Sequence, residues 1–221
     1  MKRFNCPSCG AEVEFKSAVS IYAVCPWCDS MLVRSDIDVK TIGKMAALPD
    51  DMSPLQIGSE GRYDGTHFGV IGRLKIGWRD GMWNEWHILL DSGERAWIGE
   101  AQGSFSISFE KESLDESGRS YIASRLTTPG SSAGLGAGFT IAVEGKTLRA
   151  VDIKEATCFG SEGELPFAAP KGRRTVAIDF TGSDGDFATV EVEKNVFRLY
   201  HGRYVEWDEF GFSNLRPLEG W

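Results

Sequence analysis

The chain has 221 residues and a formal net charge of −8, with 24 Lys and Arg against 32 Asp and Glu. This acidic balance argues against a general nucleic-acid-binding protein, which needs a basic surface to meet the phosphates. No segment approaches the roughly 18 consecutive apolar residues of a membrane-spanning helix, and the N-terminus lacks the apolar stretch of a secretion signal. We therefore expect no membrane span and a cytoplasmic location, where thiols stay reduced and paired cysteines indicate a metal site.

The first 34 residues contain two C-x₂-C pairs that are separated by fifteen residues. The spacing is that of a zinc ribbon, and the predicted ligands are Cys6, Cys9, Cys25 and Cys28. Two thiolates on one tight turn can bind the same ion, and Gly10 supplies the positive φ that such a turn requires. Four thiolates leave no open coordination position, so we expect a structural zinc ion in a module that spans residues 1–34.

The rest of the chain divides into a linker and a β-rich domain. Residues 35–56 are predicted as the linker, with a short strand that includes Ile37, Val39 and Ile42. Residues 57–221 contain many short alternating segments that are separated by glycine-containing turns. The predicted fold class is therefore mainly β, with a small four-cysteine zinc ribbon followed by a β-rich barrel or sandwich domain.

Two further features of the β-rich domain can be predicted. A helix is expected only around residues 118–126. An acidic residue followed by glycine precedes a strand at Asp64-Gly65 and again at Glu144-Gly145. This recurrence suggests two similar β-subdomains, over residues 57–128 and 139–221, although short turn motifs also recur by chance.

The candidate ligand-binding residues lie in two neighbouring segments of the β-rich domain. They are Trp83, Glu85, Trp86, Trp97 and Glu100. One interpretation places the Trp rings in the core and the acids in turn hydrogen bonds. A second is an aromatic and acidic pocket for a small cationic ligand. A third is a carboxylate pair, Glu85 with Glu100, of the kind that glycosidases use.

No catalytic residue can be assigned from the sequence. Cys158 is the one cysteine outside the ribbon, and no histidine motif pairs with it, so a buried structural thiol is expected. The nucleophile elbow, the zinc-protease motif and the phosphate-binding loop do not occur. We therefore expect a protein that is not an enzyme, although the sequence leaves this open.

Several phrases together resemble a bacterial family that is catalogued only as a domain of unknown function, number four-one-seven-eight. The phrases are Tyr63-Asp64-Gly65, Val70-Ile71-Gly72-Arg73, Trp83-Asn84-Glu85-Trp86, Trp97 with Glu100-Ala101-Gln102-Gly103, and Gly163-Glu164-Leu165-Pro166. Members resemble this chain in carrying a zinc ribbon before the β-rich domain. The resemblance implies no established activity. Genes of this family often lie beside genes that resemble those of polyamine aminopropyltransferases and small membrane proteins. The resemblance therefore implies a protein partner encoded nearby, in a membrane-stress or polyamine-linked system.

These observations favour a non-enzymatic, zinc-containing binding or scaffold protein that acts through protein–protein contacts. The first alternative is a hydrolase-like enzyme that uses Glu85 and Glu100. The second is nucleic-acid binding through the ribbon, which is not expected because its four basic residues are matched by three acidic ones.

Overall fold

The N-terminal module is built from short strands that follow the alternation of its sequence. In the computed structural model, which describes residues 1–35, 38–45, 48, 51–112 and 114–217, these strands are β1 (Lys2–Asn5), β2 (Glu12–Phe15), β3 (Tyr22–Val24), β4 (Ser30–Arg34) and β5 (Val39–Lys44). The short strand predicted in the linker is confirmed as β5, which pairs with β4, while Ile37 lies outside the described residues.

The rest of the described chain is dominated by two consecutive runs of five antiparallel strands. The first run is β6 (Glu60–Tyr63), β7 (Thr66–Trp78), β8 (Gly81–Leu90), β9 (Arg95–Ala101) and β10 (Ser104–Lys111). The second is β11 (Thr140–Val143), β12 (Lys146–Leu165), β13 (Arg174–Thr181), β14 (Asp186–Glu193) and β15 (Val196–Val205). The helical elements are α1 (Glu116–Arg125), the 3₁₀ turn η1 (Ser183–Gly185) and α2 (Trp207–Phe210). The predicted mainly β class is confirmed, and α1 confirms the predicted helix.

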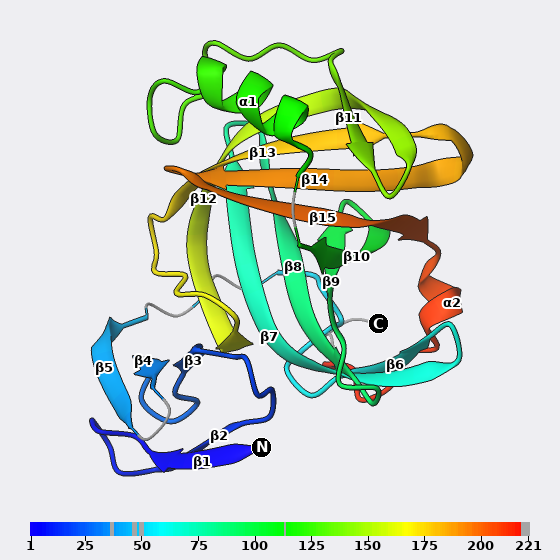
Figure 1. Ribbon diagram of the computed structural model, residues 1–221. Coiled ribbons are helices and arrows are strands. Elements are labelled where there is room, and N and C mark those ends of the chain that lie inside the picture. The colour runs from blue at the N-terminus through cyan, green and yellow to red at the C-terminus, as the bar shows by residue number, and fades with distance from the viewer. Residues whose placement is uncertain (36–37, 46–47, 49–50, 113, 218–221) are drawn as a thin grey trace.

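Strand pairing in the two runs forms a closed circuit. Each strand from β7 to β10 pairs with the next, β10 pairs with β15, and the path continues back through β14 and β13 to β12. β12 then pairs with β7, which completes the circuit of eight strands. Figure 1 shows these strands curving around a common interior, with α1 above them and the N-terminal module beside the end of β12.

The two runs open with the same turn. Asp64-Gly65 joins β6 to β7 with φ values of 46° and 77°, and Glu144-Gly145 joins β11 to β12 with 48° and 81°. Two successive positive φ angles define the tight hairpin turn that matches the twist of antiparallel strands, and glycine adopts the second one without strain. The repeated sequence pattern therefore marks a repeated structure.

The pairing pattern is also two-fold symmetric. The strands of the two runs pair in the same registers. By this match residues 60–77 of the first run correspond to 140–157 of the second, and residues 82–109 correspond to 174–201. Gly77 then pairs with its own counterpart, Thr157, and Phe109 pairs with its counterpart, His201. The symmetry breaks where the first run makes a tight turn between β7 and β8, because the second run has a longer connection there. Duplication of one ancestral unit stays a prediction.

Each helix covers the outer face of the run to which it does not belong. The α1 residue Ile122 is fully buried against the second run, where Phe180 and Val190 belong to the same core. The α2 residue Phe210 is fully buried against the first run, with its ring 6.1 Å from that of Phe68. Burial of each such side chain contributes roughly 1.5–3 kcal/mol. The opposite face of each run is therefore the one that lines the interior.

The N-terminal module is fixed to the end of β12. Ala23 and Tyr22 of β3 pair with Glu164 and Leu165, and the module shares a core with β7 and β9. The close passage of β12 over β7 depends on Gly72, where a Cβ atom would lie 2.0 Å from the carbonyl oxygen of Glu164. Among the described residues, no helix is both long and apolar enough to cross a membrane.

Candidate functional site

Two similar turns present the four cysteines of the N-terminal module. In the first, the Gly10 N–H donates to the Cys6 carbonyl and Gly10 has φ 76°; in the second, the Asp29 N–H donates to the Cys25 carbonyl and Asp29 has φ 57°. Asp tolerates this left-handed conformation better than most residues, which explains how it replaces the expected glycine. Each turn thus presents two thiols from one side.

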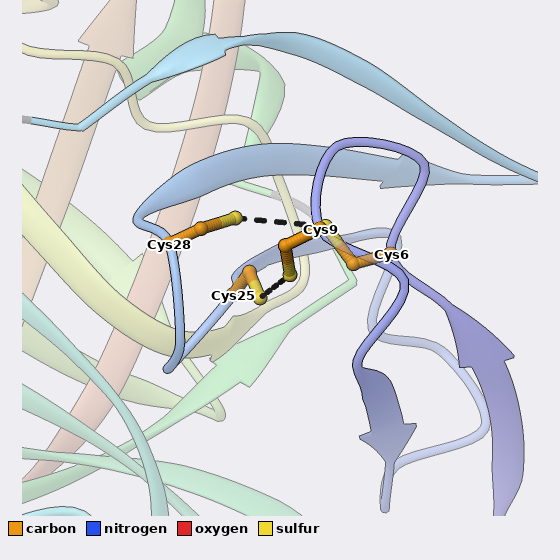
Figure 2. Close-up of side chains that lie close together, drawn as sticks. All are labelled: Cys6, Cys9, Cys25 and Cys28. Atoms are coloured by element: carbon orange, nitrogen blue, oxygen red, sulfur yellow. Dashed lines mark hydrogen bonds between the residues drawn. The ribbon is translucent and has the colours of Figure 1, made fainter.

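The four sulfurs form a compact group with the dimensions of a tetrahedral metal site. The Cys6 and Cys28 sulfurs are 3.7 Å apart, those of Cys9 and Cys25 are 3.8 Å apart, and all four lie within 4.8 Å of one another. A tetrahedron with metal–sulfur bonds of about 2.3 Å has edges of about 3.8 Å. Figure 2 shows the side chains converging from the two turns. The predicted ligands therefore fit one metal ion.

The environments of the four thiols differ: Cys6 and Cys25 are buried, Cys28 is partly exposed and Cys9 is exposed. Burial raises the pKa of Cys25 to about 12, whereas hydrogen bonds from the Ser30 hydroxyl and backbone N–H lower the pKa of Cys28 to about 6. Burial therefore opposes the loss of the Cys25 proton that metal binding requires, whereas the hydrogen bonds from Ser30 favour the thiolate of Cys28.

The basic residues of this module are largely engaged within it. Arg3 contacts both Glu12 and Glu14 of the neighbouring strand. Arg34 donates to the carbonyls of Ser17 and Ala18, and its guanidinium lies over the Phe15 ring. These contacts do not assemble the basic surface that nucleic-acid binding requires.

A buried carboxylate attaches the module to β12. The Glu164 side chain accepts hydrogen bonds from the backbone N–H groups of Lys16 and Ser17, at 2.7 and 3.1 Å. The Glu164 carbonyl accepts a hydrogen bond from Nδ1 of His87, for which burial lowers the pKa to about 4 and keeps the ring neutral. This one residue connects the module, β12 and β8.

We expect Glu164→Gln to loosen the N-terminal module. An amide nitrogen cannot accept from an N–H group, so one backbone donor loses its partner at a cost of about 1–3 kcal/mol. Hydrogen exchange should quicken at residues 16–24, with little change in β14 and β15. Exposed Glu94→Gln is the control, and equal exchange in the two variants would contradict the assignment.

The five predicted ligand-binding residues divide between the two faces of the sheet. Trp83 and Glu85 point inward together, and the Trp83 indole donates to the Glu85 carboxylate at 2.9 Å. Trp86 and Asn84 point outward, where both donate to the carboxylate of Glu100. Glu85 and Glu100 therefore lie on opposite faces of β8 and β9, and the structure does not assemble them into a catalytic pair.

The outward group belongs to a polar network that the sequence did not reveal. Its centre is Asp51, whose carboxylate contacts Arg73, Lys75 and Arg216. The Arg73 guanidinium also lies over the Trp86 ring, 4.7 Å from its centroid. This network joins the segment before β6 and the C-terminal segment to the outer face of β7 and β8.

The inward group lines a cavity of about 440 Å³ inside the strand circuit. Trp83 and Glu85 of β8 and Trp97 of β9 face residues from β10 and from four strands of the second run. The charged side chains among these added residues are Lys154, Asp179 and Glu191. Because they lie far from Glu85 in sequence, only closure of the circuit brings them together. The volume is in the usual range for small-molecule sites.

Glu85 lies deep in the protein, and its side chain borders the cavity. Burial raises its pKa to about 7, and the nearby charge of Glu191 adds to the effect, against the hydrogen bond from Trp83 and the charge of Arg173. Within the part of the chain that the structure describes, no cationic side chain is ion-paired with Glu85. Cys158, in contrast, is buried with its thiol pKa raised to about 11, as expected for an unreactive structural cysteine.

We expect Glu85→Gln to stabilise the protein above neutral pH. A carboxyl whose pKa rises from 4.5 to about 7 on folding favours the folded state at low pH, and that advantage is lost as the pH rises through 7. Urea unfolding should therefore give the variant about 1–3 kcal/mol more stability than wild type at pH 8, and equal stability at pH 4. Lower stability of the variant at pH 8 would refute this account of Glu85.

The fold and the site together define an antiparallel β protein with a four-cysteine metal-site module at its N-terminus. A family model described as Domain of unknown function (DUF4178) matches residues 56–207, and the chain belongs to this family. The match spans the two five-stranded runs and begins after the four-cysteine module. No curated protein and no solved structure gives a significant match to the chain.

Proposed function

We propose that this protein is a non-enzymatic binding protein in which zinc stabilises the N-terminal ribbon and the ribbon contacts a partner protein. The closed set of four cysteine ligands supports a structural role for the metal, because no position is left for a catalytic water. Zinc is the ion that four thiolates in this geometry most often hold. The five cysteines are free of disulfides, which fits a reducing, cytoplasmic setting.

The observation that carries the proposed contact is the exposure of Trp27. Its side chain is 75% exposed, although it lies on the rigid turn between the ligands Cys25 and Cys28. A large aromatic ring on a fixed backbone loses little conformational entropy on binding, and Trp is enriched among residues that dominate the energy of protein interfaces. Trp27 is therefore our candidate anchor for the partner.

The proposed setting is a bacterial cell in which a neighbouring gene encodes the partner, as part of a membrane-stress or polyamine-linked system. This element of the proposal rests on the family resemblance. The exposure of Trp27 supports a contact at the ribbon, and the family resemblance suggests where a partner should be sought.

The metal and the contact can be tested separately. Elemental analysis of protein purified without added metal should find about one equivalent of zinc, and iron or no metal would overturn the zinc assignment. Wild-type, Trp27→Ala and Met52→Ala proteins then serve as baits in lysate of the native host; Met52 is similarly exposed but lies outside the ribbon. A protein retained by wild type and Met52→Ala and lost with Trp27→Ala supports the proposal. Identical recovery with all three baits refutes it.

A further inference from the structure

The cavity inside the strand circuit carries an inference that is independent of the ribbon and its partner. We propose that this cavity binds a small organic amine, with the ammonium group paired to the Glu85 carboxylate and the apolar body against Trp83 and Trp97. The observations that support this assignment are the charge balance of the cavity wall, its aromatic surfaces and its exposed rim.

The charge balance singles out Glu85. The Asp179 carboxylate is 3.1 Å from the Lys154 ammonium and accepts from the Thr189 hydroxyl at 2.7 Å. The Glu191 carboxylate is 3.2 Å from the Arg173 guanidinium. Both acids thus have a cationic partner in the protein, although Lys154 is shared with Asp152 and Arg173 with Glu193.

Glu85 differs from these two acids in having a neutral partner, the Trp83 indole. Among the described residues, no ion pair offsets its charge. An ionised carboxylate beside a partly desolvated cavity favours a cation over a neutral or anionic guest. The wall therefore selects for a positive charge at one point.

Aromatic rings provide the remaining recognition surface. Trp97 is largely buried: its ring stacks with His87 at 4.8 Å and with Phe167 at 5.9 Å and meets the Tyr200 ring at 6.5 Å, so it offers the cavity apolar surface. Trp83 adds another ring, next to Glu85. Aromatic faces attract cations as well as apolar groups, and this attraction strengthens where water is excluded. An amine with an apolar body satisfies both the carboxylate and these rings.

The cavity has an accessible rim. Trp78, Met82 and Tyr204 line it, and their exposed fractions are 37%, 52% and 54%. Trp78 lies at the end of β7, Met82 near the start of β8 and Tyr204 near the end of β15. A small molecule can therefore approach past apolar side chains before it reaches Glu85.

The test uses three probes of nearly the same shape: 3-phenylpropylamine, 3-phenylpropan-1-ol and 3-phenylpropanoate. Calorimetric titration of the full-length protein at pH 8 should show binding of the amine in the millimolar range or tighter, roughly tenfold or more above the alcohol. The carboxylate probe should not bind. Equal affinity for amine and alcohol, or no amine binding at about 10 mM, would overturn the proposal.

Glu85→Gln tests the role of the carboxylate in the same protein. We expect amine affinity to fall at least tenfold while alcohol affinity is unchanged, whereas Glu94→Gln, on an exposed loop, should bind like wild type. Thermal unfolding of each variant confirms that it is folded. Undiminished amine binding by folded Glu85→Gln would refute the assignment.

The pH dependence distinguishes this carboxylate from a merely apolar site. The charged groups around Glu85 are Glu191, Asp179, Arg173 and Lys154, which are already ion-paired. The titratable neighbours Cys158 and Tyr200 both have a raised pKa, so neither ionises between pH 5 and pH 8. Amine affinity should therefore rise between pH 5 and pH 8 as Glu85 ionises, and the Gln variant should lack this rise. A pH-independent affinity in wild type would contradict the proposed ion pair.

Discussion

Replacing Cys25 with serine should abolish stoichiometric metal binding and unfold the ribbon. A module of about 30 residues buries too little apolar surface to fold alone, and structural zinc supplies about 10–16 kcal/mol in comparable small domains. Three thiolates hold the ion far less tightly than four. Elemental analysis should show a metal content well below one equivalent, and hydrogen exchange should show lost protection in β1 to β5 with protection retained in β14 and β15.

Cys158→Ser is the matched control for this prediction. It makes the same sulfur-to-oxygen change at a buried thiol whose neighbours are the carbonyls of Gly160 and Ala169. This variant should keep its metal and its protected ribbon. A Cys25→Ser protein with a full equivalent of metal and wild-type exchange would contradict the structural role of the four-cysteine site.

Asp51→Asn should destabilise the β domain by about 3 kcal/mol, the lower end of the usual cost of removing one partner from a buried ion pair, because Arg73 keeps a second carboxylate in Glu162 at 3.5 Å. The side chains of Arg73 and Lys75 are only 5% and 4% exposed, and both contact the Asp51 carboxylate. An asparagine of the same size removes the negative charge that both side chains contact. Chemical unfolding of wild type and variant at pH 7 measures the difference.

Asp80→Asn provides the comparison, because Asp80 forms a solvent-exposed ion pair with Arg79. The side chain of Arg79 is 88% exposed. Such a pair contributes at most about 1 kcal/mol. Equal effects of the two substitutions would mean that the Asp51 network contributes nothing beyond an ordinary surface pair.

The same network predicts that the wild-type protein loses stability at acidic pH. Burial alone would raise the pKa of Asp51, but the hydrogen bond from Lys75 and the charges of Arg73 and Lys75 outweigh it and lower the pKa to about 2. A lowered folded pKa stabilises the protein above about pH 4, and this contribution disappears as the pH falls through 2. The difference between wild type and Asp51→Asn should therefore shrink over that range.

Local features of the sequence predicted the local features of the structure. The spacing of the four cysteines identified the metal ligands because two turns position all four thiols. The Asp64-Gly65 and Glu144-Gly145 pairs predicted a turn before a strand at each place, and the structure adds that both turns close hairpins. Alternation along β8 places Glu85 and Trp86 on opposite faces of the sheet, as it does for successive residues of any strand.

What the sequence could not supply was the register between distant strands. The face of the sheet on which Glu100 lies depends on its pairing with Asn84. The cavity wall opposite Glu85 depends on the pairing of β12 with β7. The Asp51 network similarly combines a segment before β6 with Arg216, near the C-terminus. No local pattern encodes these encounters, because they arise only when the circuit closes.

Closure of the circuit also affects how the protein meets other copies of itself. β6 and β12 occupy successive lengths of one side of β7, and β11 and β7 do the same along β12. All eight strands of the circuit therefore have neighbours on both sides, and its flanking strands β6 and β11 are only four residues long. Long open edges are what promote strand addition and fibril growth, and short edges oppose both. We expect the folded β domain to resist this route to aggregation even at high concentration.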